Sequence, residues 1–340
     1  MADLQDESEA GPCVGAPESP APVVADALER AAALLAEHPV ADGCNTLVWT
    51  LRQTPYHDTD TDIPRLRSGA VGAQFWSLLT PTTGDRVVAD TLELIDIAHD
   101  LVHAYPDELL LALTAGDLAD ARNRGRIASF LGPVSGSTLT DSLGTLHAFH
   151  KLGVRSLAPA GATWAQDDLT PFGHEVVREA NRLAMGLDLT GCPPEAAVQI
   201  AGASRAPVLI SHTGAAALTR HPLNVPDEVL LAVRATGGVC MVSFSAEQTG
   251  DSLHAVADHL DHIRGVAGPQ SVGLGACFGS DPPHGHPTGL TDPSGYPRLF
   301  AELLDRGWPE PDLALLAWDN VARVLRDVEF TSRAAHHRKP

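Results

Sequence analysis

The sequence predicts an α/β fold, a (βα)8 barrel of the TIM type with extra helices at its C-terminal end. Short apolar runs alternate with helical patterns along almost the whole chain, in about eight successive pairs. Alternation of this kind gives parallel strands covered by helices, and eight units favour a closed barrel over an open sheet. The glycine-rich phosphate-binding patterns of dinucleotide-binding and P-loop folds are absent from the positions where those folds need them.

The predicted strands and helices follow one another in a regular order. The strand-like runs lie near residues 40–44, 71–79, 109–113, 127–131, 154–158, 186–189, 208–211, 239–244 and 272–275. An Ala-rich amphipathic helix is expected at 24–37, and further helices near 86–104, 115–123, 142–152, 172–184, 193–203, 226–235 and 253–266. Closely spaced helices follow, including Pro297–Asp305 and Ala317–Arg326.

The composition divides the chain into one domain and two tails. Residues 1–23 are acidic and rich in Pro, Ala and Gly, so we expect a disordered tail there. We assign residues 24–330 to a single barrel domain and residues 331–340 to a flexible tail.

The charge balance and the cysteines restrict the partners and the compartment. Lys and Arg total 23 and Asp and Glu total 43, and the net charge of −20 disfavours binding to nucleic acid or to an anionic membrane. No signal-peptide pattern or membrane-spanning apolar run is visible. Five cysteines, none in a Cys-x-x-Cys pair, indicate free thiols. We therefore expect a cytoplasmic protein with no membrane partner.

The stretch from Asp62 to Ser77, Asp-Ile-Pro-Arg-Leu-Arg-Ser-Gly-Ala-Val-Gly-Ala-Gln-Phe-Trp-Ser, resembles a signature of the renal (membrane) dipeptidase family. The resemblance covers nearly the whole chain, from about His38 to Arg326, and its flanking motifs are specific. The resemblance implies a barrel like those of metal-dependent hydrolases. It also implies an enzyme that uses two zinc ions to hydrolyse dipeptides. In such barrels the ligands lie at the C-terminal ends of the strands, and one carboxylate bridges the two ions.

Most of the metal ligands that the resemblance implies are replaced in this chain. Cys44 and Thr46 stand where the family's Asp-Gly-His-Asn-Asp-Leu has its ligating His and second Asp. Val134 stands at the bridging Glu, and Gly191 stands at a ligating His. His212 is the family ligand that this chain keeps.

The implied catalytic positions are replaced as well. Gly161 stands where the family has a His that stabilises the tetrahedral intermediate. Leu223 stands at an Arg that clamps the substrate carboxylate, and Cys277 stands at the Asp expected to shuttle a proton. Catalytic residues for this chain are therefore unknown from the sequence.

This contrast between a preserved scaffold and an emptied site predicts a degenerate member of the family. We expect a pseudo-enzyme without dizinc dipeptidase activity and with no resident cofactor in place of the two zinc ions. It would act as a binding or partner subunit, as a homodimer or as a heterodimer with an active paralogue. Two alternatives stay open: a hydrolase with a re-purposed site of Cys44, His212 and Cys277, and a residual dipeptidase.

Four residues with metal-binding side chains fall at or near predicted strand ends. Cys44, Cys192, His212 and Cys277 could form a Cys3His zinc set. Thiols are also common small residues in apolar pockets, and a single His at a strand end is often structural. His284 and His286, on the loop after the last strand, are expected to belong to a solvated loop rather than to a metal site.

Overall fold

The computed structural model describes residues 22–54, 59–81, 84–166, 168–279 and 285–337, and the acidic tail expected at 1–23 falls almost wholly outside these ranges. The strands are β1 (Val40–Asn45), β2 (Val71–Trp76), β3 (Leu109–Leu111), β4 (Ile127–Leu131), β5 (Val134–Ser135), β6 (Ser156–Ala158), β7 (Gly186–Leu187), β8 (Leu209–Thr213), β9 (Val239–Val242) and β10 (Val272–Leu274).

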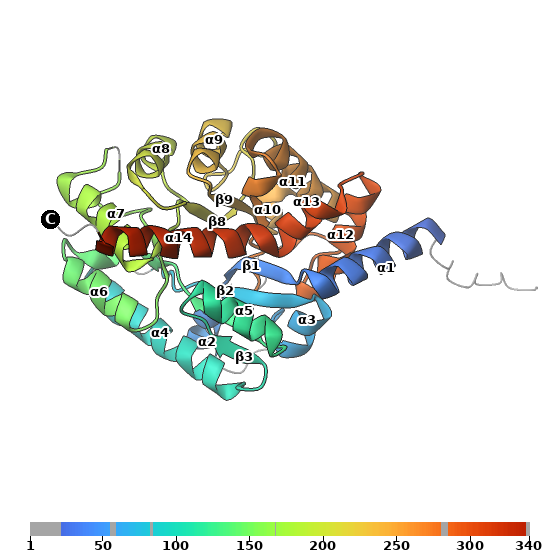
Figure 1. Cartoon of the computed structure of the whole chain (residues 1–340), viewed down its shortest axis with the longest axis horizontal. Coiled ribbons are helices and arrows are strands. Elements are labelled where there is room, and N and C mark those ends of the chain that lie inside the picture. Colours follow the sequence, from blue (N-terminus) through green and yellow to red (C-terminus); the bar gives the residue numbers. More distant parts are fainter. Residues whose placement is uncertain (1–21, 55–58, 82–83, 167, 280–284, 338–340) are drawn as a thin grey trace, which may run out of the picture.

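Helices follow nearly every strand (Figure 1). They are α1 (Pro22–Glu37), α2 (Leu47–Gln53), α3 (Ile63–Ser68), α4 (Val87–Ala104), α5 (Ala115–Asn123), α6 (Leu143–Lys151), α7 (Pro171–Leu183), α8 (Pro194–Ala203), α9 (Asp227–Ala235), α10 (Ala246–Thr249), α11 (Leu253–Ala267), α12 (Tyr296–Asp305), α13 (Glu310–Ala314) and α14 (Asn320–His337). A π-helical turn, Leu315–Asp319, joins α13 to α14. No helix in the described ranges is long and apolar enough to span a bilayer.

The strands close into the predicted barrel. Parallel pairing runs in the order β4, β2, β1, β10, β9, β8, and a second parallel sheet holds β5, β6 and β7. Two parallel bridges join the sheets, one from Leu131 to Val154 and one from Asp188 to Leu209. The ring therefore contains β1, β2, β4, β6, β7, β8, β9 and β10 in chain order, as a (βα)8 barrel requires. The short strand β3 pairs with the start of β4 and lies outside this ring.

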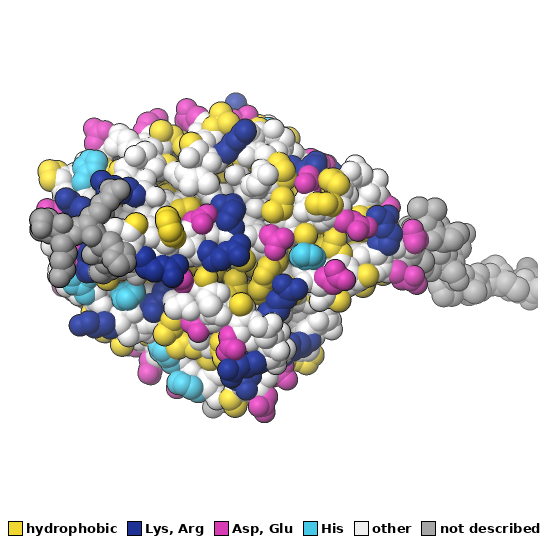
Figure 2. Space-filling view, in the orientation of Figure 1, with side chains coloured by type: hydrophobic (Ala, Val, Ile, Leu, Met, Phe, Trp, Pro, Cys, Tyr) yellow, Lys and Arg dark blue, Asp and Glu magenta, His cyan; other side chains and the backbone are white. Residues whose placement is uncertain are grey.

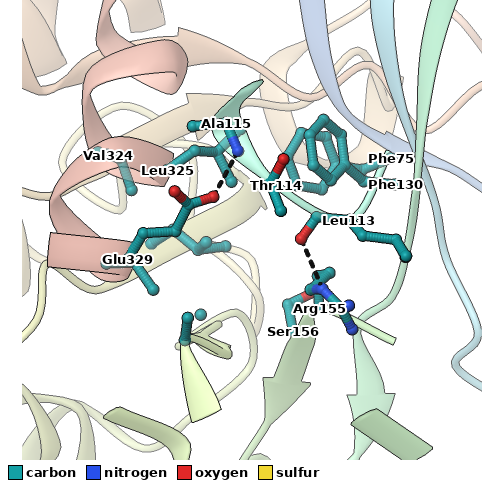
Figure 3. Close-up of a pocket in the computed structure, with 14 residues that line it drawn as sticks. Phe75, Leu113, Thr114, Ala115, Phe130, Arg155, Ser156, Val324, Leu325 and Glu329 are labelled. Atoms are coloured by element: carbon teal, nitrogen blue, oxygen red, sulfur yellow. Dashed lines mark hydrogen bonds between the residues drawn. The ribbon is translucent and has the colours of Figure 1, made fainter. Parts of the chain in front are cut away.

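The N-terminal end of the barrel is closed by packing. Figure 1 shows α14 lying across the strands, and it supplies part of the wall of a small pocket of about 20 Å³. This volume suits about one water molecule. In Figure 3 the Glu329 carboxylate accepts a hydrogen bond from the Ala115 amide, and Arg155 donates to the Leu113 carbonyl at 2.8 Å. We call this end of the barrel, lined by Phe75, Phe130, Ser156, Leu209 and α14, the floor.

The surface over the floor carries side chains of mixed character. Figure 2 shows acidic, basic and hydrophobic side chains interspersed over the described part of this face. The sequence predicted a flexible tail from residue 331, but in the structure helix α14 continues to His337. The Ser332 hydroxyl donates to the Arg182 carbonyl of α7, which holds this last stretch of helix on the domain.

Candidate functional site

The opposite end of the barrel, at the C-terminal ends of the strands, is hollow, and we call it the mouth. Two pockets of about 330 and 290 Å³ open there, and both are lined by Thr46 and His212. Leu223, Gln248, Cys277 and His286 are among the residues that complete the first pocket, whereas Cys44, Trp49 and Ser77 are among those that complete the second. The two pockets therefore meet at Thr46 and His212, where barrel enzymes carry their chemistry.

Three residues with metal-binding atoms meet between these pockets. The ligand atoms of Cys44, His212 and Cys277 all lie within 4.8 Å of one another, and the two sulfur atoms are 3.0 Å apart. The Cys277 amide donates to the Cys44 carbonyl at 3.0 Å, so the backbone holds the two thiols together. Cys277 has a φ of +60°, a left-handed conformation that non-glycine residues adopt at a cost and that is typical of functional sites.

A buried carboxylate fixes both cysteine segments. Asp42 lies on β1 with no exposed surface, and its Oδ1 accepts hydrogen bonds from the amides of Cys44 at 3.1 Å and Ala276 at 3.0 Å. Its Oδ2 has no hydrogen-bond partner among the described residues. Burial raises the pKa of Asp42 to about 6. The two amides and Tyr296 lower this pKa, but burial has the larger effect.

A chain of hydrogen bonds orients His212. Its Nδ1 lies 3.0 Å from the Ser211 hydroxyl, which lies 3.2 Å from the Thr190 hydroxyl, and Thr190 donates to Asp188 Oδ1 at 2.7 Å. Because the carboxylate can only accept, the protons line up from the ring: Nδ1–H donates to Ser211, and Ser211 donates to Thr190. This arrangement holds the ring through Nδ1, while the His212 side chain also interacts with Cys44.

The protonation of Cys44 and His212 is coupled. The contact with Cys277 and burial both raise the pKa of Cys44 above its usual value, while His212 lowers it. Desolvation lowers the pKa of His212. Negative charge on Cys44, Asp188 and Asp42 raises this pKa by more, and the net result is a pKa of about 9. Each charge stabilises the other, so the two residues titrate as a pair.

The two-zinc centre that the resemblance implies does not fit these side chains. The Thr46 hydroxyl donates to the Phe278 carbonyl at 3.1 Å, and Val134, at the bridging position, is an apolar side chain with no exposed surface. At Gly191 a Cβ would lie 3.3 Å from a methyl group of Leu223, so the leucine occupies the space above the glycine. Two ions need a bridging carboxylate, and none stands at these positions.

The remaining predicted residues lie apart from the cluster. Cys192 is buried but lies outside the three-residue group, and burial raises its pKa to about 12. Gly161 faces open space, since a Cβ there would meet nothing within 4 Å. His286 is not part of a solvated loop: its side chain is 4% exposed and bonds Asp60 and the Phe244 carbonyl. His284 lies outside the described residues.

Sequence reasoning missed the polar residues beneath the cluster. Asp42, Asp188, Thr190 and Ser211 are all buried and were not singled out. One signal was present: Asp42 precedes Cys44 by two residues within the same strand, so both lie on the same face of β1.

Comparison with known proteins agrees with this fold. The family model "Membrane dipeptidase (Peptidase family M19)" matches residues 28–339. Dipeptidase 3 of Mus musculus is 38% identical over 334 residues, covering 88% of this chain and 66% of the relative. Dipeptidase 3 of Homo sapiens is 35% identical over 352 residues, covering 94% and 71%. The chain thus spans about two thirds of the length of these relatives.

Solved structures show the same fold. A metallo peptidase from Rhodobacter sphaeroides, liganded with a phosphinate mimic of the dipeptide L-Ala-D-Ala, matches with a TM-score of 0.76 at 22% identity, covering 85% of this chain and 99% of its own. The probable dipeptidase PvdM from Pseudomonas aeruginosa matches with a TM-score of 0.81 at 18% identity, covering 90% and 99%. The family match over nearly the whole domain, the similar relatives and the common barrel establish that this chain belongs to the membrane dipeptidase family, M19.

Proposed function

We propose that this chain is a family member without dizinc dipeptidase activity and that it acts as a binding or partner subunit. The observation that carries the proposal is Val134, a fully buried apolar residue at the bridging position. A bridging carboxylate holds both ions and the nucleophilic water of a two-metal hydrolase, and a valine methyl cannot replace it. The proposed binding role therefore requires no pair of catalytic zinc ions.

Recognition of a dipeptide carboxylate is also weakened. Leu223 stands at the position of the clamping Arg and packs over Gly191, so it offers an apolar methyl where bidentate hydrogen bonds would be needed. The mouth nevertheless keeps pockets of about 330 and 290 Å³, which supports binding of a small ligand. The absence of a cation at position 223 favours a ligand without a free carboxylate there.

The alternative of a cysteine hydrolase has one observation in its favour and one against it. Cys44 and His212 lie together, as a nucleophile and base must. However, the Cys277 contact and burial raise the pKa of Cys44, whereas a catalytic cysteine requires a lowered one. A binding role therefore accounts for the site better than a thiolate nucleophile or a residual dipeptidase.

We further propose that the protein is cytoplasmic and works as a homodimer or with an active paralogue. The cysteines in the described ranges, Cys44, Cys192, Cys240 and Cys277, are free thiols, and this supports a reducing compartment. The net charge of −20 supports partners other than nucleic acid or anionic membrane.

The test is hydrolysis of a panel of L-L and L-D dipeptides with added zinc. We expect turnover more than about a hundredfold below the median enzyme value of roughly 10 per second. His212→Ala serves as the control, because any true activity of the mouth should depend on the retained ligand. Turnover above this limit that disappears in His212→Ala would contradict the proposal.

A further inference from the structure

We propose that Cys44, His212 and Cys277 bind a single zinc ion, with a fourth coordination position open to the mouth. This inference goes beyond the proposed function and departs from the expectation of no resident cofactor. Two thiolates and one imidazole with an open position form one of the ligand sets found in zinc enzymes. The ion would be mononuclear and held by a ligand set different from the one that the family resemblance implies.

The distances between the ligand atoms suit one ion. Zinc–sulfur bonds of about 2.3 Å in a tetrahedral site place two thiolates about 3.8 Å apart. The sulfur atoms of Cys44 and Cys277 are 3.0 Å apart, so a small rotation of the side chains accommodates the ion. The ligand nitrogen of His212 lies within 4.8 Å of both sulfur atoms, so three potential ligands converge on one point.

The surroundings of His212 prepare it as a ligand. The hydrogen bonds through Ser211 and Thr190 to Asp188 hold the ring through Nδ1, so that Nε2 is the atom that would bind zinc once its own proton is released. Metal-binding histidines are commonly held in this way, with the second ring nitrogen bonded to a polar partner that fixes the tautomer. Asp188 also accepts hydrogen bonds from the Thr190 and Ser211 amides, so the same carboxylate fixes the backbone on which His212 stands.

Two buried carboxylates also position the ligands. Asp42 and Asp188 have no exposed surface. Both act electrostatically on His212, so both lie within range of the cluster. Asp42 accepts a hydrogen bond from the Cys44 amide, and Asp188 accepts one from the Thr190 hydroxyl behind His212, so the two carboxylates hold two of the three ligands in place.

The fourth position faces the pockets. Thr46 and His212 line both pockets, so the ion would lie where the two meet, and a water molecule or a small donor ligand could complete its coordination. Dipeptide hydrolysis by the family's route would still require the second ion and its bridge. The metal site therefore does not depend on the presence or absence of dipeptidase activity.

The experiment measures zinc in the full-length chain. Protein purified under reducing conditions is incubated with zinc, freed of excess by a weak chelator and analysed for metal. We expect one zinc per chain, and less than about a tenth of that in Cys44→Ser, Cys277→Ser and His212→Ala, because each removes one of three protein ligands. Cys192→Ser is the matched control, since it removes a buried thiol of the mouth outside the cluster, and it should keep its zinc.

A second measurement keeps the test independent of folding defects in the variants. Cobalt added to the wild-type protein should give the near-ultraviolet absorption of cobalt–thiolate bonds. Wild-type protein that stays below about a tenth of an ion per chain, or zinc that persists in both serine variants, would overturn the proposal. A disulfide between Cys44 and Cys277 that forms in air, together with no zinc uptake by the reduced protein, would also overturn the proposal. Dipeptide turnover, measured separately, tests the proposed function alone.

Discussion

The floor and the mouth of the barrel are held by different kinds of contact. At the floor, Phe75 and Phe130 stack with ring centroids 4.9 Å apart, and α14 covers them. At the mouth, buried carboxylates, hydroxyls and histidines position the loops, and Cys277 adopts a left-handed backbone conformation. The floor thus resembles an ordinary apolar core, whereas the mouth keeps the buried polar groups and strained backbone typical of a functional site.

The family signature and the positions that we propose to be replaced lie in different parts of the barrel. The signature that led to the family begins at Asp62 and runs through β2, which is part of the barrel wall. The positions where we propose that family ligands are replaced, such as Thr46, Val134 and Gly191, all lie at or just after strand ends. A barrel separates stability from chemistry in this way, and its strand ends can lose one activity while the core stays intact.

The largest effect should come from the floor. Phe130 is 1% exposed and packs on Phe75 of the neighbouring strand, so Phe130→Ala should lower the free energy of unfolding by about 3 to 5 kcal/mol. Urea unfolding measures it, with Leu152→Ala, at a side chain 40% exposed, as the control. A loss below about 1 kcal/mol would mean that the floor is not a packed core.

The mouth should instead respond to pH through His259. This residue is 2% exposed, its Nδ1 accepts from the Ala215 amide at 2.8 Å, and its Nε2 lies 3.3 Å from the Thr219 hydroxyl. Burial, with the positive charge of His262, lowers its pKa to about 4. Protonation of Nδ1 would break the bond that holds the loop after β8.

The direction of this effect follows from proton uptake. Between pH 6.5 and 4 the unfolded chain binds the proton and the folded chain does not, so stability is complete above pH 6.5 and is lost as the pH falls. The loss should be about 1 to 3 kcal/mol. His259→Gln, which keeps an acceptor but cannot titrate, should show a flatter pH profile in thermal melts. Equal slopes in wild type and variant would remove His259 as the cause.

The fold was largely predictable from the sequence, whereas the site was predictable only in part. Apolar periodicity located the strands, but it could not show that β3 lies outside the ring, because pairing depends on distant residues. Apolar periodicity also did not predict where α14 ends. In the last part of this helix the Ser332 hydroxyl donates to a carbonyl of α7.

At the site, the sequence predicted that Cys44, His212 and Cys277 lie at strand ends, and parallel strands end at one edge of a barrel. The structure brings these three residues together. Cys192 shares that edge but lies outside the group. The hydrogen bonds from His212 to Asp188 depend on side-chain rotamers, which a sequence pattern does not specify.

The smallest expected effect tests how closely Leu223 and Gly191 fit. Gly191 has a φ of +72° and its Cβ would lie 3.3 Å from Leu223, so Gly191→Ala should cost about 1 kcal/mol from backbone conformation plus a few tenths from the contact. Gly161→Ala is the matched control, because Gly161 has a φ of +74° and no atom within 4 Å of such a Cβ. Adding Leu223→Ala should remove the excess of the Gly191 variant over the Gly161 variant in chemical unfolding. If the two glycine variants cost the same while Leu223 is present, the leucine does not fill the space above Gly191, and the mouth has more room for a ligand than the packing implies.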